Sequence, residues 1–273
     1  MLGVMSGQGF SRYVAIGDSQ TEGLWDGDDD TGLTGFADRL AVMLDSLHPG
    51  LLYANLAVRG RQVIDVLNDQ LPAALAMRPD LITVCIGMND VTLPGGDFET
   101  ALADLEEVYR QLSECGATVL TTTFPDVVRL LPTGRFIAAR VQRINALIRV
   151  AARRYGFALV DLYSAPAMTA TETWSIDKIH ASSRGHTLFA AAAAAALNLP
   201  GSNGDWTRSS GHSLDGSPLA RTVAQLQWAG TWFIPWFWRC LRGQSSGDGR
   251  LPKYPALIPV SSFAGRLLHQ ETR

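Results

Sequence analysis

The stretch "YVAIGDSQTEG", from Tyr13 to Gly23, decides how the rest of the chain is interpreted. Its first residues are apolar and suited to a buried strand, and they run directly into a Gly-Asp-Ser turn. Ser19 in such a turn is either a turn or helix-capping residue, as Ser and Asp commonly are, or a nucleophile. Turn statistics alone favour the first interpretation. A nucleophile would require a base, an orienting acid and oxyanion donors elsewhere in the chain.

Strand-length apolar runs alternate with helical patterns as far as residue 198. The runs that predict strands cover 13–17, 51–56, 80–87, 117–124 and 157–162. The patterns that predict helices cover 35–47, 61–77, 97–114, 134–155 and 182–198. This alternation predicts an α/β fold with a central parallel sheet between helices. Ligands bind such sheets at the carboxyl ends of the strands, where "GDSQ", "RGRQ", "GMND" and "TFPD" fall.

Length and composition limit the classes of protein to consider. The chain has 273 residues, of which 47% are hydrophobic, enough for one large domain with an appendage. Residues 1–200 carry 15 basic and 22 acidic side chains, whereas 201–273 carry 8 and 4. The acidic body argues against nucleic acid as a partner.

Cysteine usage and the start of the chain bear on location. Cys85, Cys115 and Cys240 form neither a disulfide framework nor a zinc pattern, which fits a reducing compartment. Only a dozen residues precede the first strand, so no cleavable signal peptide is expected. No apolar run reaches the roughly 20 residues that span a bilayer. We expect a cytoplasmic protein.

The composition changes after Pro200 and divides the chain into three parts. We expect residues 1–200 to form the α/β domain, 201–218 a Gly/Ser-rich linker, and 219–273 an aromatic, basic C-terminal extension. The cluster "WAGTWFIPWFWRCLRG" in this extension holds four of the seven tryptophans. Such a band suits contact with a membrane surface, self-association or an acyl-chain channel. The alternative is an aromatic face packed onto the acidic body, which bulky aromatic side chains favour.

A base and an orienting acid stand far along the chain in "WSIDKIHASSRGH". Asp177 lies three residues before His180, so in a loop its carboxylate can fold back to Nδ1 and leave Nε2 for Ser19. The alternative is a polar loop that leads into a helix capped by Ser182. Taken alone, the pair leaves both interpretations open.

Oxyanion donors are also available at predicted strand ends. Gly60, in "NLAVRGR", lacks a Cβ, so its backbone N–H can approach a ligand closely. Asn89, in "IGMND", offers a side-chain amide, and the N–H of Ser19 makes a third donor. Singly, Gly60 is a loop glycine and Asn89 a turn or cap residue. Together with the pair above, they favour a catalytic site.

These segments resemble the conserved blocks of the SGNH (GDSL) hydrolase superfamily, which is named for its Ser, Gly, Asn and His. The blocks follow the family's order: Ser19 in "GDSQTEG", Gly60 in "NLAVRG", Asn89 in "GMND", and Asp177 with His180 in "DKIH". The resemblance implies a three-layer, flavodoxin-like α/β/α fold and serine acyl-enzyme chemistry without a metal or cofactor. Gln20 stands where the family often has leucine, a departure that concerns the packing of the turn.

Four further residues are candidates for binding substrate. Arg59 and Arg61 flank Gly60 and could hold a carboxylate or phosphate, or could be surface charges at a helix start. Phe124 follows the fourth strand and is a candidate wall of the acyl pocket, and Trp232 belongs to the aromatic band. The aspartates of "LWDGDDDTG" lack EF-hand spacing, so a solvated loop is favoured over a calcium site.

The blocks leave the fate of the acyl group open. The expected substrate is an acyl ester or thioester. If water takes the acyl group from the enzyme the product is a free acid, and if a bound alcohol takes it the product is a new ester. Transfer to a sugar or polyol is one reading; the alternative is a simple carboxylesterase or lipase-like hydrolase. A non-catalytic lipid- or membrane-binding module is disfavoured, because the chain contains every residue that the chemistry needs. These are Ser19, Gly60, Asn89, Asp177 and His180. The Arg-rich, Trp-tailed chain also resembles actinobacterial acyltransferases of this superfamily, which implies octanoyl transfer to glucosylglycerate-type precursors of methylglucose lipopolysaccharides.

Overall fold

The protein is described by a computed structural model. It covers residues 9–30, 32–93, 96–130, 132–208, 230–231, 235, 238 and 245–265. Most of the aromatic extension, including Trp232, therefore lies outside the described residues, as do Cys240 and residues 209–218 of the predicted linker.

A six-stranded sheet in the order β7-β6-β5-β1-β4-β8 forms the centre of the fold. Its strands are β1 (Arg12–Gly17), β4 (Leu52–Asn55), β5 (Leu81–Cys85), β6 (Thr118–Thr122), β7 (Ala158–Val160) and β8 (Tyr254–Pro259). The first five run parallel, with β1 between β4 and β5. Four of the five fall within the apolar runs that predicted strands, and β1 begins one residue before its run.

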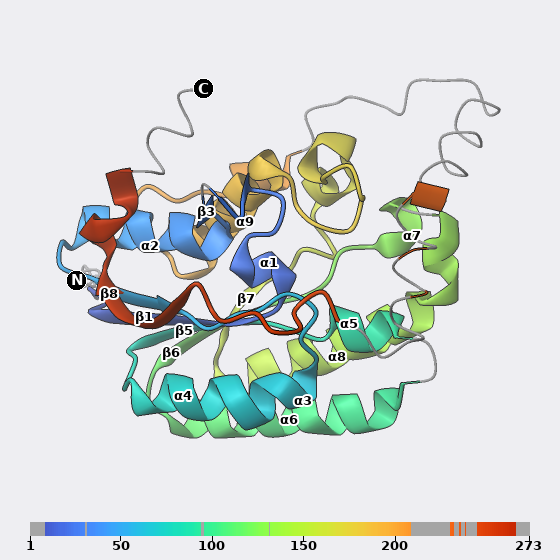
Figure 1. Ribbon diagram of the computed structural model, residues 1–273, viewed down its shortest axis with the longest axis horizontal. Coiled ribbons are helices and arrows are strands. Elements are labelled where there is room, and N and C mark those ends of the chain that lie inside the picture. Colours follow the sequence, from blue (N-terminus) through green and yellow to red (C-terminus); the bar gives the residue numbers. More distant parts are fainter. Residues whose placement is uncertain are drawn as a thin grey trace, which may run out of the picture.

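Helices cover both faces of the sheet (Figure 1). One face carries α2 (Phe36–Leu47) and α9 (Ser183–Ala196), and the other carries α4 (Leu71–Ala76), α6 (Phe98–Glu114) and α8 (Ala138–Tyr155). The interior strands β1 and β5 are buried on both faces, as their near-continuous apolar sequences require. The predicted three-layer α/β/α fold is confirmed.

Short elements connect these layers and build the loops at the carboxyl ends of the strands. They are α1 (Ser19–Glu22), β2 (Gly27–Asp28), β3 (Gly32–Leu33), α3 (Val63–Asp65), the π-helix η1 (Val66–Gln70), α5 (Met88–Thr92), α7 (Val127–Leu130), and the 3₁₀-helices η2 (Pro132–Phe136), η3 (Pro166–Thr169), η4 (Thr171–Thr173), η5 (Asp205–Thr207) and η7 (Val260–Ser262). The predicted helix over 61–77 is thus divided into α3, η1 and α4.

The edge strand β8 differs from the expectation of a purely parallel sheet. It pairs antiparallel with β4, with Leu52 opposite Pro259 and Tyr53 opposite Ile258. Its sequence, "YPALIP", contains two prolines, which an edge strand tolerates because one side needs no ladder hydrogen bonds. A hexapeptide with two prolines gives no strand signal, so this strand was not predicted from the sequence.

Aromatic packing fixes β8 and the turn after it to the body. Phe263 is 3% exposed and stacks on Tyr254, with ring centroids 5.2 Å apart. Both rings also contact Tyr53 of β4, at 5.7 and 5.9 Å respectively. Part of the C-terminal extension therefore belongs to the hydrophobic core.

Among the described residues, no helix has both the length and the apolar character needed to cross a membrane. Cys85 is buried in β5 and Cys115 is partly buried, and both are free thiols.

The aromatic contact of Phe263 predicts a large effect on stability. We expect Phe263→Ala to lower the free energy of unfolding by about 3–5 kcal/mol, the usual cost of removing a buried phenylalanine. Leu251→Ala is the control, because Leu251 is 85% exposed and its truncation should change stability by less than about 0.5 kcal/mol. Urea unfolding measures both, and equal effects would contradict the placement of β8.

Candidate active site

Ser19 is placed by the abrupt turn between β1 and α1. Gly17 ends β1 with φ 147°, and a Cβ there would clash with the carbonyl oxygen of Cys85, so the turn requires glycine. Asp18 caps α1, since its Oδ1 accepts a hydrogen bond from the Gln20 N–H at 3.2 Å. Ser19 is the first residue of the helix and is 7% exposed.

His180 and Asp177 reach Ser19 from a loop that precedes α9. His180 Nε2 lies 2.8 Å from Ser19 Oγ, and His180 Nδ1 lies 2.6 Å from Asp177 Oδ2. The backbone of this loop is fixed by a bridge between Trp174 and Ala181 and by a Ser175 N–H to His180 C=O hydrogen bond of 2.8 Å. The carboxylate therefore folds back onto Nδ1, as the three-residue spacing predicted.

The carboxylate of Asp177 is saturated with donors. Its Oδ1 accepts hydrogen bonds from the Ser175 hydroxyl at 2.6 Å and from the N–H groups of Ile179 and His180 at 2.9 and 3.0 Å. Its Oδ2 accepts one from Trp25 Nε1 at 2.7 Å, in addition to the contact with Nδ1. Burial alone would raise the pKa of Asp177, but the interactions with His180 and the donors outweigh it and hold the pKa well below its ordinary value. The residue stays ionised.

Gly60 and Asn89 follow β4 and β5, the two neighbours of β1. Gly60 has φ 76°, a left-handed conformation that favours glycine. Asn89 lies in α5, and its Nδ2 donates to the carbonyl of Arg61 at 2.7 Å and approaches Asp18 Oδ2 at 3.5 Å. The bond to Arg61 fixes the amide plane, and the second contact of the amide, to Asp18, is long.

Two buried carboxyl groups support these loops. Asp18 is 3% exposed, and burial raises its pKa to about 7. Burial also raises the pKa of Asp90 to about 6, and this side chain accepts hydrogen bonds from the Val63 N–H at 3.1 Å and from Gln62 Nε2 at 3.3 Å. Asp90 thus connects the loop after β4 to α5.

Arg59 and Arg61 have different surroundings. The Arg59 guanidinium is buried and donates to Glu22 at 2.9 and 3.0 Å and to Asp29 at 3.0 Å. These contacts favour a structural role over the predicted substrate contact. Arg61 is more exposed and pairs loosely with Asp65 at 3.4 Å, so its charge is accessible beside Gly60.

Of the two aromatic candidates, the structure describes Phe124. Phe124 is 5% exposed, and its backbone N–H and C=O are both held by the side-chain amide of Asn145 at 2.8 Å. It belongs to the hydrophobic core. Trp232 lies outside the described residues.

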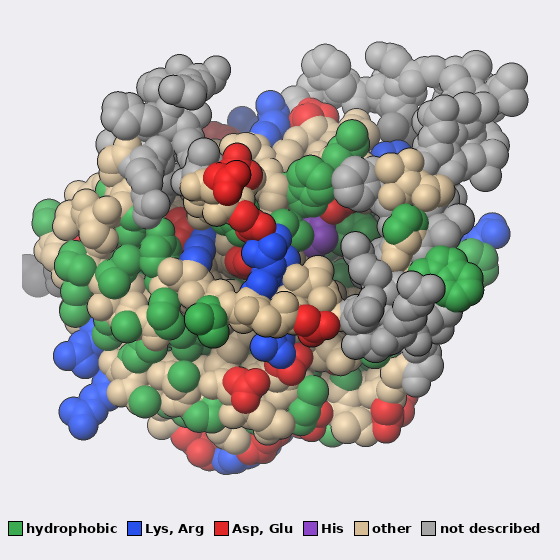
Figure 2. All heavy atoms as spheres, viewed as in Figure 1, with side chains coloured by type: hydrophobic (Ala, Val, Ile, Leu, Met, Phe, Trp, Pro, Cys, Tyr) green, Lys and Arg blue, Asp and Glu red, His purple; other side chains and the backbone are tan. Residues whose placement is uncertain are grey.

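Aspartates of the acidic loop after α1 form ion pairs with arginines. Asp26 binds Arg39 at 2.8 Å, and Asp29 binds Arg250 at 2.7 Å in addition to Arg59. Acidic and basic side chains accordingly lie together over the centre of the face seen in Figure 2. No group of His, Cys, Asp and Glu suited to a metal ion occurs among the described residues.

Sequence reasoning missed four residues that hold the site. Trp25 and Gln20 contact the loop of Asp177 and His180, and neither carries a sequence signal for this role. Arg250 and Lys253 reach the body from beyond residue 200, with Lys253 Nζ 2.6 Å from Asp38 Oδ2. The opposite charges of the two parts of the chain were the one available indication.

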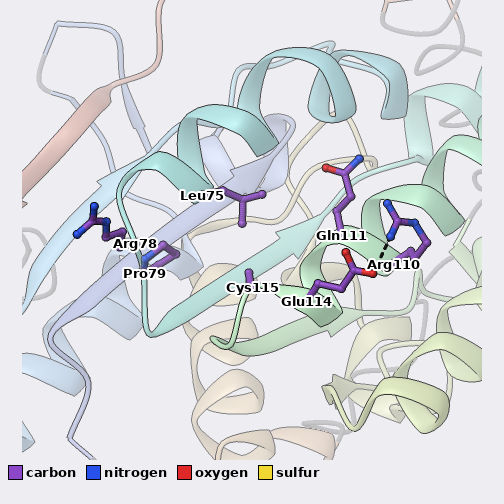
Figure 3. Close-up of a pocket in the computed structure, with 7 residues that line it drawn as sticks. All are labelled: Leu75, Arg78, Pro79, Arg110, Gln111, Glu114 and Cys115. Carbon is purple, nitrogen blue, oxygen red and sulfur yellow. Dashed lines mark hydrogen bonds and ion pairs between the residues drawn. The ribbon is translucent and has the colours of Figure 1, made fainter.

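A separate cavity of about 510 Å³ lies at the other end of the sheet (Figure 3). Arg78 and Pro79 in its wall precede β5, and Cys115 precedes β6, so it lies at the amino ends of these strands. Arg110 in the same wall is paired with Glu114 at 2.7 Å. The cavity contains none of the residues around Ser19.

With this fold and site, the protein is a serine esterase-type enzyme. The chain belongs to the GDSL-like Lipase/Acylhydrolase family, whose pattern it matches over residues 15–188. This match includes Ser19, Gly60, Asn89, Asp177 and His180, and it confirms the SGNH superfamily that the sequence blocks predicted.

Solved structures with the same fold show low sequence identity. LAE5, an alpha/beta hydrolase enzyme from the metagenome of Lake Arreo, is 24% identical, with a TM-score of 0.57 over 69% of this chain and 95% of its own. Axe2, an acetylxylan esterase from Geobacillus stearothermophilus, is 19% identical, with a TM-score of 0.57 over 73% and 97%. A putative GDSL-like lipase from Parabacteroides merdae is 17% identical, with a TM-score of 0.59 over 69% and 96%. A comparison with curated proteins finds no match.

The buried carboxyl of Asp18 predicts a pH-dependent stability. The unfolded chain releases this proton near the ordinary pKa of 3.8, whereas the folded protein keeps it up to about 7. The free energy of unfolding therefore falls as the pH rises between these values. Because asparagine stays neutral, we expect Asp18→Asn to raise the melting temperature relative to the wild type more at pH 8 than at pH 5.

Thermal unfolding at the two pH values measures this effect. Asp30→Asn, at an exposed position of the neighbouring loop, is the control and should behave alike at both. A constant difference between Asp18→Asn and the wild type across this range would contradict the prediction.

Proposed function

We propose that Ser19 is the nucleophile of this enzyme, that His180 is its general base and acid, and that Asp177 orients the imidazole. The observation that carries the proposal is the continuous chain of contacts from Ser19 Oγ through His180 to Asp177, at 2.8 and 2.6 Å. The ionised carboxylate fixes the tautomer with hydrogen on Nδ1, which leaves Nε2 free to accept the serine proton.

The oxyanion site in this proposal consists of the N–H groups of Ser19 and Gly60 and the side-chain amide of Asn89. These groups follow three adjacent strands and are rigidly held, so they need little rearrangement as negative charge develops. The anchoring of Asn89 on the Arg61 carbonyl supports this role, because it sets the direction of the remaining N–H.

The reaction then proceeds through an acyl-enzyme. His180 takes the proton of Ser19 as Oγ attacks the carbonyl carbon of an acyl ester or thioester, and it returns the proton to the departing alcohol or thiol. A second molecule, either water or an alcohol, loses a proton to His180 and attacks the acyl-serine. Ser19 is regenerated by the same steps in reverse.

For the alcohol we propose a sugar or polyol, with transfer of a short or medium acyl chain as the finer function. Axe2 acts on acetylated xylan, an acyl-sugar ester, and shares the fold of this chain. The charge of Arg61 beside Gly60 supports an acceptor with an anionic group, such as a glucosylglycerate, with octanoyl as a candidate acyl group. Simple ester hydrolysis is the second candidate, favoured by the esterase-type family.

The location and further partners are proposals of the same kind. The free thiols of Cys85 and Cys115 support a reducing, cytoplasmic location. The aromatic band that includes Trp232 supports peripheral membrane contact or self-association on its sequence alone.

Substitution of the proposed catalytic groups tests the mechanism. We expect Ser19→Ala and His180→Ala to lower kcat for a p-nitrophenyl ester by several orders of magnitude, and Asn89→Ala by about 10² to 10³. Thr187→Ala, an exposed hydroxyl on α9, is the control and should keep full activity. Full turnover by Ser19→Ala would disprove the assignment.

An acceptor screen separates transfer from hydrolysis. The enzyme is incubated with an octanoyl thioester, with and without sugars, polyols and glucosylglycerate, and the products are identified by mass spectrometry. For a transferase we expect a new ester that accumulates only with an acceptor, at the expense of free acid. Free acid at the same rate under all conditions would show a hydrolase and contradict the finer proposal.

A further inference from the structure

We infer that Gln20 and Trp25 are positioning residues that hold the loop of Asp177 and His180 against the segment that carries Ser19. The inference rests on the proposed function, since it assumes that these three residues carry the chemistry. Neither residue was a candidate in the sequence analysis, where Gln20 only replaced a leucine in the turn.

Gln20 holds the backbone on both sides of His180. Its Nε2 donates to the carbonyl of Ile179 at 3.0 Å, and its Oε1 accepts from the Ala181 N–H at 3.3 Å. The flanking peptide groups are therefore bound by the residue next to the nucleophile. A leucine has neither donor nor acceptor, so in this chain the glutamine adds a connection that a leucine would not provide.

Trp25 holds the carboxylate of Asp177. Its Nε1 donates at 2.7 Å to Oδ2, the same oxygen that lies 2.6 Å from His180 Nδ1. Two donors on one carboxylate oxygen restrict the rotation of the group, so the indole sets the direction in which Oδ2 faces the imidazole.

The backbone of Trp25 is held in an unfavourable conformation. Its φ is 74°, in the left-handed region that residues with a Cβ rarely adopt. The next residue, Asp26, is anchored by the buried ion pair with Arg39 and by its N–H to the Gly23 carbonyl at 3.1 Å. These contacts hold the backbone next to Trp25, and the side chain, 38% exposed, is bound at its Nε1 by Asp177.

The two contacts act on different parts of the same loop. Gln20 binds its backbone and Trp25 binds its carboxylate, and both come from the segment 19–25 that begins with Ser19. The distance between Ser19 Oγ and His180 Nε2 is therefore set from the nucleophile's own side of the site. Since catalysis falls steeply with misplacement of reacting groups, loss of either contact should slow the chemical step.

The test uses Gln20→Met, which keeps the length of the side chain, and Trp25→Phe, which keeps an aromatic ring. In a p-nitrophenyl ester assay we expect Trp25→Phe, which removes one hydrogen bond, to lower kcat about tenfold. Gln20→Met removes two and should lower kcat at least as much, and KM should change by less than about twofold in both variants. The rate at which a fluorophosphonate labels Ser19 should fall by the same factor.

Matched controls are Gln111→Met and Trp206→Phe. Gln111 donates a hydrogen bond to Glu107 within α6, and Trp206 is a partly buried residue of η5. Both should keep kcat and KM. Thermal unfolding of every variant confirms that the protein is folded at the assay temperature.

The outcomes distinguish the inference from the proposed function. If Ser19→Ala is inactive while Gln20→Met and Trp25→Phe turn over like the wild type, the inference alone is wrong. A loss carried by KM, or one that merely follows the unfolded fraction, also overturns it. If Ser19→Ala itself retains turnover, the proposed function fails.

Discussion

The parallel pairing of β1 with β4 and β5 is the constraint on which the rest of the structure depends. Ala15 lies opposite Asn55, and Gly17 lies opposite Cys85, so three strands end at the same edge of the sheet. The segments that follow them carry Ser19, Gly60 and Asn89. A shift of one residue in either pairing would turn every side chain of the shifted strand to the opposite face of the sheet and would separate these groups. The site therefore rests on the register of a rigid, buried sheet.

Local sequence predicted most of this arrangement, because periodicity and turn chemistry are local properties. The five parallel strands, the long helices and the meeting of Ser19 with His180 and Asp177 all follow from apolar runs and from motif spacing. Arg59 and Phe124 show the limit of such reasoning. Both stand beside motifs in the sequence. Tertiary packing buries them and decides their partners, which are Glu22 for Arg59 and Asn145 for Phe124.

Contacts between distant segments account for what sequence reasoning missed. Gln20 and Trp25 are ordinary residues of a turn until residues more than 150 positions away are brought next to them. The edge strand β8 has the same origin, because its two prolines and exposed side chains obscure a role that only pairing with β4 defines. Local propensity is weak in such segments, and tertiary context decides their structure.

The ion pair between Asp29 and Arg250 joins positions 221 residues apart, and β8 closes the sheet from a similar distance. Such contacts form late, because closing a long loop costs entropy that earlier, more local contacts must first offset. During synthesis, the sheet from β1 to β7 can assemble while the edge of β4 is still uncovered. The loop that follows Ser19 therefore gains its contact with Arg250 only after that residue has been synthesised.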